Sequence, residues 1–137
     1  MVKILLVDDD ESLRVALTKA LQRMGHEIRT AENGRKALEV HRDWLPDLII
    51  TDLIMPEKEG LETIQCVRAK DKTVKIIAMS GGGRANPNDY LEIALHLGAN
   101  AILPKPFELE QLQSAIQPFL PSSAPLLAEK MLLNGKS

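Results

Sequence analysis

The stretch that decides the fold is residues 46–52, Pro46-Asp47-Leu48-Ile49-Ile50-Thr51-Asp52. Its apolar residues follow one another without the polar alternation of a strand that has one face in water. Such a run is typical of a strand that is covered on both faces, in the middle of a parallel sheet. Pro46 ends the helical segment before it, so we expect a central strand over residues 47–52.

Outward from this strand, short apolar runs alternate with amphipathic segments of helical period. We expect further strands at 3–7, 27–31, 74–79 and 100–103, the second of them at a sheet edge, and helices between them, the fourth over 89–97. The alternation predicts an α/β fold, a doubly wound parallel sheet with helices on both faces. The first and last helices should turn these residues inward: Leu13, Leu17, Ala20, Leu21 and Met24, and Leu109, Leu112, Ala115, Ile116 and Phe119.

Length and composition are those of one globular domain. The chain has 137 residues, of which 45% are hydrophobic, and its net charge of −2 shows no basic excess that would favour direct nucleic-acid binding. No apolar run reaches the roughly 18 residues of a membrane span, and Cys66 is expected to be a half-buried helix residue in a reducing cytoplasm. We expect the domain to cover residues 1–120 and a tail or linker remnant to cover 121–137.

Polar residues close four of the predicted strands. Asp8 and Asp9 follow the first, Asp52 closes the third, Ser80 follows the fourth and Lys105 comes just after the fifth. Because the carboxyl ends of parallel strands lie along one edge of a sheet, we expect these side chains to meet there. Three carboxylates, a hydroxyl and an ammonium at one place suit a magnesium-dependent phosphoryl transfer onto an aspartate.

The physical chemistry of that reaction explains the residue types. A carboxylate is nucleophilic without deprotonation, but as an anion it is repelled by a phosphoryl group. Mg²⁺ relieves this repulsion and takes oxygen ligands, which Asp9 and Asp52 can supply, with Asp8 acting through a water. Ser80 and Lys105 can each donate to a phosphoryl oxygen.

Three segments together resemble the receiver domain of bacterial two-component response regulators. They are Val7-Asp8-Asp9-Asp10-Glu11-Ser12-Leu13-Arg14, the stretch from Pro46 to Pro56, and Lys105-Pro106-Phe107. The resemblance runs from about Val2 to Phe119. It implies a flavodoxin-like three-layer sandwich with a five-stranded sheet in the order 2-1-3-4-5.

The resemblance also implies a role for each site residue. Asp52 would be the phospho-acceptor, and Asp8, Asp9, Asp52 and the main-chain carbonyl of Ile54 would hold Mg²⁺. Ser80, Gly81 and Lys105 would form the phosphoryl-binding and switch group, and a cis peptide bond would precede Pro106. The implied partners are a histidine kinase or phosphotransfer protein and a downstream target or fused output domain, and a homodimer stays open.

Two departures from the family pattern limit what carries over. Receivers commonly place Tyr or Phe three residues before the lysine, as a ring that swings inward, and this chain has Ile102 there. The positions two residues beyond Asp52 and Ser80 hold Ile54 and Gly82, whose side chains cannot orient a hydrolytic water. We therefore predict a slow loss of the phosphoryl group.

Two alternatives compete with a signalling switch that turns over no external substrate. A phosphatase of the haloacid dehalogenase type also begins with a strand and an Asp-x-Asp pair, as in Asp8-Asp9-Asp10, but it would leave Asp52 without a role. The other is a receiver that acts only as a docking module, without phosphorylation. We also expect Asp9 or Asp10 to cap the first helix, His41 to lie at a surface or helix edge, and residues 55–60 to form a loop.

Overall fold

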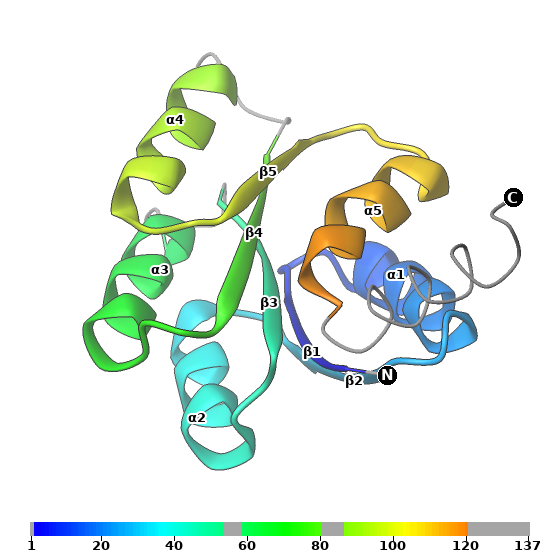
Figure 1. The fold of residues 1–137 in the computed structure, drawn as a ribbon, viewed down its shortest axis with the longest axis horizontal. Helices are drawn as coiled ribbons and strands as arrows, with labels where there is room; N and C mark the ends of the chain where they lie inside the picture. Colours follow the sequence, from blue (N-terminus) through cyan, green and yellow to red (C-terminus); the bar gives the residue numbers. More distant parts are fainter. Residues whose placement is uncertain (1, 54–58, 81–86, 121–137) are drawn as a thin grey trace, which may run out of the picture.

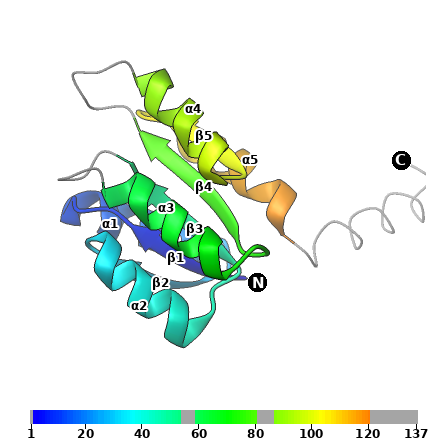
Figure 2. The same ribbon diagram turned by 90° about the vertical axis from the view of Figure 1, so that its left-hand side faces the viewer.

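The chain folds into a five-stranded parallel sheet between two layers of helices (Figures 1 and 2). The computed structural model describes residues 2–53, 59–80 and 87–120, so the expectations for Ile54, Gly81, Gly82 and the tail 121–137 lie outside the described residues. The elements in chain order are β1 (Lys3–Val7), α1 (Glu11–Arg23), β2 (Glu27–Ala31), α2 (Gly34–Trp44), β3 (Leu48–Asp52), α3 (Glu59–Lys70), β4 (Lys75–Ser80), α4 (Pro87–Leu97), β5 (Ala101–Pro104), α5 (Leu109–Ile116) and the 3₁₀ turn η2 (Gln117–Phe119).

The strand order is β2-β1-β3-β4-β5, as the resemblance implies, and β3 lies at the centre. All five residues of β3 are buried, whereas β2 at the edge is mostly exposed. The absence of polar alternation in 47–52 therefore predicted the central strand correctly, because a strand covered on both faces has no solvent side. Among the described residues, no helix is long and apolar enough to cross a bilayer.

Two hydrophobic cores form because successive strand side chains point to opposite faces of the sheet. Leu5 and Ile49 belong to the core under α2, α3 and α4, and Ile4 and Ile50 belong to the core under α1 and α5. Figure 1 shows the same division, with α1 and α5 on one side of the sheet and the other three helices on the opposite side.

Several sequence expectations differ from the structure. The fourth and fifth strands and the fourth helix are displaced by one or two residues, and α3 begins at Glu59, so Glu59 and Gly60 are helical and not part of a loop. Leu109 is 50% exposed because it is the first residue of α5 and extends past the core that Leu112 and Ile116 fill. Cys66 is exposed and not half-buried, since it lies on the outer face of α3.

His41 is also placed differently from the expectation. Its side chain is buried, and its Nε2 lies 2.9 Å from Asp71 Oδ2 in the segment between α3 and β4. The carboxylate satisfies the imidazole away from water, which is the condition under which a polar ring can be buried at low cost.

Candidate functional site

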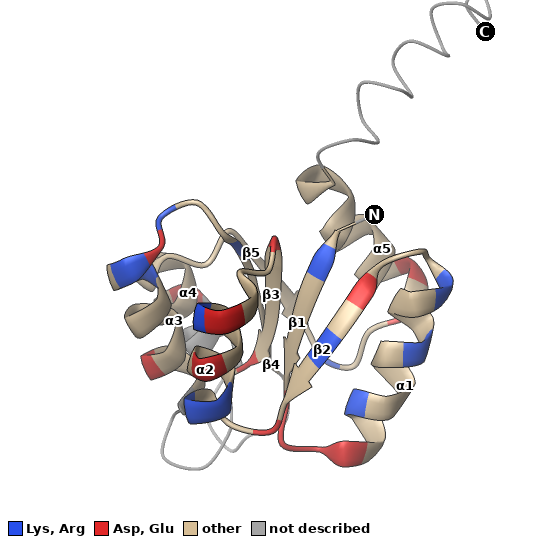
Figure 3. Ribbon diagram, turned by 90° about the horizontal axis from the view of Figure 1, so that it is seen from below, with Lys and Arg blue, Asp and Glu red and all other residues tan. Residues whose placement is uncertain are grey.

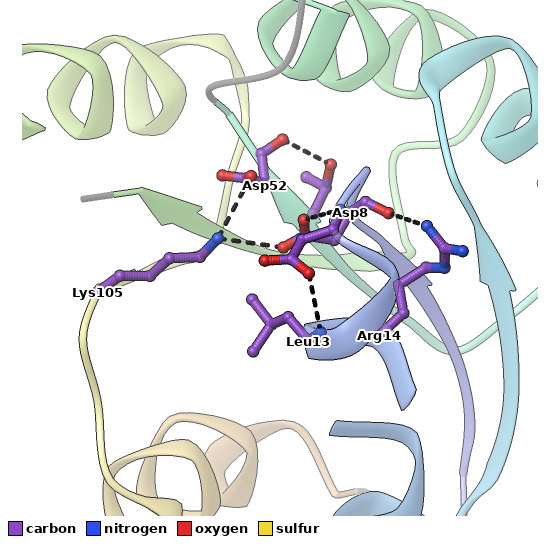
Figure 4. A network of polar contacts seen from close by, with 7 residues as sticks. Asp8, Leu13, Arg14, Asp52 and Lys105 are labelled. Carbon is purple, nitrogen blue, oxygen red and sulfur yellow. Dashed lines mark hydrogen bonds and ion pairs between the residues drawn. The ribbon is translucent and has the colours of Figure 1, made fainter. Parts of the chain in front are cut away.

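The predicted residues meet at the carboxyl edge of the sheet. One carboxylate oxygen each from Asp8, Asp9 and Asp52 lies within 4.8 Å of the others. Lys105 Nζ lies 3.1 Å from Asp8 Oδ2 and 3.3 Å from Asp52 Oδ2, so the ammonium bridges two of the three acids (Figure 4). Ser80 ends β4, and its carbonyl accepts a hydrogen bond of 2.8 Å from the Lys105 main chain.

The acidic residues come from two neighbouring strand ends. Asp8 and Asp9 follow β1, and Asp52 is the last residue of β3, which pairs with β1. In Figure 3 the turn from β1 into α1 carries a group of acidic residues next to the strand ends. Asp10, the last of this group, is the N-cap of α1: its side chain accepts from the Leu13 main-chain N–H, which leaves Asp8 and Asp9 for the cluster.

Burial makes the cluster electrostatically unusual. Asp8 and Asp52 are 0% and 5% exposed, while Asp9 is exposed to solvent. Carboxylates are rarely buried unless charged partners or hydrogen bonds compensate them. With three carboxylates and one ammonium, the cluster keeps an excess of negative charge that a cation would offset.

The negative charge of the cluster also shifts the pKa of Lys105. Burial alone lowers the pKa of the ammonium, but the adjacent carboxylates of Asp52 and Asp8 outweigh that effect and hold the pKa above its ordinary value. Lys105 therefore keeps its charge throughout the physiological pH range.

Two features suit the site to a divalent cation and to an incoming hydrogen-bond acceptor. The acidic donors are all carboxylate oxygens, the hard ligands that magnesium and calcium take, and the cluster could hold a metal. The Ser80 hydroxyl is fully buried and has no hydrogen-bond partner among the described residues. Because buried hydroxyls are normally satisfied, Ser80 is suited to an acceptor that is brought to the site.

Lys105 is joined to Pro106 by a cis peptide bond, the isomer that the resemblance implies. Ile102 in β5 packs against the core under α2, α3 and α4. Its side chain is aliphatic and partly buried there.

Three residues of the site were not picked out from the sequence. Arg14 Nη1 donates to the Asp8 carbonyl at 2.8 Å, and Thr51 Oγ1 donates to the Asp52 carbonyl at 3.1 Å. Gly60 lies in the first turn of α3 against the main chain of Asp52 and Leu53, where a methyl group would have no room. A glycine so soon after β3 is a signal of close approach that the sequence did offer.

Comparison with known proteins identifies the class. The model of the response regulator receiver domain matches residues 4–117, which is most of the chain. The chain therefore belongs to the receiver domains of two-component response regulators.

The relatives show the breadth of that class. The chain is 39% identical over 122 residues to the DNA-binding transcriptional regulator NtrC of Azospirillum brasilense; this match covers 89% of the chain and 25% of NtrC. It is 29% identical over 119 residues to the sporulation initiation phosphotransferase F of Bacillus subtilis, with 87% of the chain and 94% of that protein covered. The chain thus spans a quarter of one relative and nearly all of another.

Solved structures agree with this assignment. The chemotaxis response regulator CheY4 of Vibrio cholerae superposes with a TM-score of 0.77 at 33% identity, over 88% of this chain and 99% of that one. A receiver domain protein from Clostridium thermocellum gives a TM-score of 0.81 at 25% identity, over 92% and 99% of the two chains.

Proposed function

We propose that this domain takes a phosphoryl group from a histidine kinase or a phosphotransfer protein onto Asp52. The observation that carries the proposal is the position of the Asp52 carboxylate, which shares one cluster with Asp8 and Asp9 and lies 3.3 Å from the Lys105 ammonium. Neither the haloacid dehalogenase alternative nor the docking alternative gains support from the family match, and the first leaves Asp52 unused.

Asp8, Asp9 and Asp52 would hold Mg²⁺, together with the Ile54 carbonyl that the family pattern assigns. A bound ion would supply positive charge that offsets the negative charge developing as the group is transferred. Their carboxylates supply oxygen ligands of the type that Mg²⁺ prefers.

The chain's own residues direct the transfer. An oxygen of Asp52 attacks phosphorus, the new P–O bond replaces the P–N bond of the phosphohistidine donor, and the imidazole leaves with a proton from solvent. Lys105 already lies beside Asp52 and can follow the charge onto a phosphoryl oxygen. The Ser80 hydroxyl donates to another oxygen and so gains the partner that it lacks among the described residues.

The consequence is a switch and not turnover of an external substrate. Phosphorylation adds negative charge at the end of β3, beside β4, and shifts the balance between two conformations that differ in affinity for a downstream target or fused output domain. We place this signalling in the cytoplasm. Because Ile54 and Gly82 offer no polar side chain for a hydrolytic water, the phosphorylated form should be long-lived.

Incubation with acetyl phosphate and Mg²⁺ tests the proposal. The expected product is one phosphoryl adduct, stable to acid and labile to base, which mass spectrometry of peptides places on Asp52. Asp52→Asn should remain unmodified, and omission of Mg²⁺ should remove the adduct from the wild type. An adduct on another residue, or hydrolysis of a general phosphomonoester, would contradict the proposal.

A further inference from the structure

Arg14 reaches from α1 to the end of β1 and binds the main chain of Asp8. The side chain lies within the first turns of α1, and its Nη1 donates to the Asp8 carbonyl oxygen at 2.8 Å (Figure 4). This carbonyl belongs to a fully buried residue beyond Val7, the last residue of β1. A buried carbonyl at a strand end needs a partner, and the guanidinium supplies one.

This hydrogen bond acts on Asp9 as well as on Asp8. The peptide bond is planar, so the Asp8 carbonyl oxygen and the nitrogen and Cα of Asp9 lie in one plane. Fixing the oxygen therefore fixes the plane from which the Asp9 side chain projects. That matters because Asp9 is exposed, and no hydrogen bond from the described part of the chain holds its carboxylate.

The rest of the turn is held from other directions. The Asp8 carboxylate accepts from the Asp10 main-chain N–H at 2.9 Å and from Lys105 at 3.1 Å, and the Asp8 N–H donates to the Ala31 carbonyl at 3.1 Å. None of these three contacts is made by the carbonyl of the peptide that joins Asp8 to Asp9; the hydrogen bond from Arg14 holds that carbonyl.

We infer that Arg14 is a positioning residue that preorganises Asp8 and Asp9 for a divalent cation. The inference rests on the proposed function, because it concerns the metal that the proposed phosphorylation needs. The contact that Arg14 makes with this turn is to the Asp8 main-chain carbonyl, so it acts through the main chain between two proposed ligands. Groups that orient metal ligands in this way typically change metal affinity by about 10- to 100-fold when they are removed.

An electrostatic role and a positioning role of Arg14 predict opposite changes in Mg²⁺ affinity when the side chain is lost. Removing a cation near an acidic cluster reduces repulsion, so an electrostatic role alone predicts tighter Mg²⁺ binding in the variant. Positioning predicts weaker binding, since the freed peptide must be reordered when the ion binds. Salt separates the two further, because it screens a through-space effect and leaves a lost hydrogen bond unchanged.

The experiment measures Mg²⁺ affinity by isothermal titration calorimetry on the full chain. Arg14→Met keeps the aliphatic stem without donors, Arg14→Lys keeps the charge without the planar fork, and Lys19→Met removes an exposed charge from the same helix as a control. We expect the Kd of Arg14→Met to rise about 10-fold at low and at high salt. Lys19→Met should match the wild type, and Arg14→Lys should fall between the two.

A second readout excludes general damage. At saturating Mg²⁺ the rate of Asp52 phosphorylation by acetyl phosphate should recover in Arg14→Met, because the ion then orders the turn that Arg14 normally holds. Should Arg14→Met fail to fold, Arg14→Lys decides the matter, and an unchanged Kd in that variant overturns the inference. Equal or tighter Mg²⁺ binding in folded Arg14→Met overturns it too and leaves Asp52 as acceptor. A wild type that binds no Mg²⁺ overturns both proposals.

Discussion

At Gly60 a single added methyl group should disturb both the fold and Asp52, the proposed phospho-acceptor. A Cβ at this position would lie 2.5 Å from the Leu53 Cα and would overlap the Asp52 carbonyl oxygen, and real Cβ contacts stay above 3.0 Å. Both neighbours are main-chain atoms that no rotamer change can move. In Gly60→Ala, either α3 or the end of β3 must therefore shift by at least about half an ångström.

Two opposing terms set the effect on stability. Overpacking of this kind costs about 1–3 kcal/mol, while replacing a helical glycine by alanine returns about 1 kcal/mol. We expect a net destabilisation of up to about 2 kcal/mol, measured by urea unfolding followed through circular dichroism. Gln65→Ala, at an exposed position of the same helix, is the control and should stay within about 0.5 kcal/mol of the wild type.

The same shift should slow phosphorylation, since it displaces the main chain that carries Asp52. A misplacement of 1 Å in a reacting group can cost about 100-fold in rate, so half of that should cost about 10-fold. The assay compares rates of acetyl phosphate labelling at saturating Mg²⁺. A Gly60→Ala protein as stable and as fast as the wild type would refute the reasoning and place α3 farther from β3 than the structure does.

Three further predictions concern single contacts. Ser80→Ala should leave the free energy of unfolding unchanged or raise it by about 1 kcal/mol, because the buried hydroxyl has no partner among the described residues, yet it should slow labelling of Asp52; a clear loss of stability in urea would contradict this. Leu45→Asn should raise the free energy of unfolding by about 0.5–1 kcal/mol, because Leu45 is 63% exposed and held at a φ of 54°, a left-handed conformation that asparagine tolerates; a lowered urea midpoint would oppose it. Burial raises the pKa of Asp71, but hydrogen bonds from His41, Thr73 and Val74 outweigh burial and hold the pKa well below 3.8. This carboxylate therefore stabilises the fold above pH 3.8 and loses its contribution as the pH falls toward the lowered pKa. Asp71→Asn should cost about 2 kcal/mol at pH 7 and progressively less below pH 3.8, and a cost independent of pH would contradict the assignment.

Much of the candidate site could be predicted because its residues mark strand ends. Asp8, Asp52 and Ser80 each follow or close an apolar run, and parallel strands bring such ends to one edge. Lys105 was found in the same way, after β5. The roles assigned to these residues came from the resemblance, and they stay proposals until Asp52 phosphorylation is measured.

The residues that lie elsewhere than expected do so because of how distant elements pack together. His41 was expected at a surface because nothing near it in the chain reveals Asp71, which is 30 residues away. Leu109 fitted the apolar stripe of a helix, but its place at the start of α5 leaves it half exposed. Neither result can be derived from periodicity, which reports a face of a helix and not where the helix begins to cover the core.

The sequence by itself determined the sheet, the central position of residues 48–52 and the gathering of Asp8, Asp9, Asp52 and Lys105, because strand periodicity and strand ends are local properties of the chain. Only the tertiary structure decided that Arg14 binds the Asp8 carbonyl and that Gly60 lets α3 pack closely against the main chain of Asp52. It also decided that the Ser80 hydroxyl is buried without a partner among the described residues. These contacts follow from the distance and angle at which whole elements pack, and close packing fixes those only when the complete core is assembled.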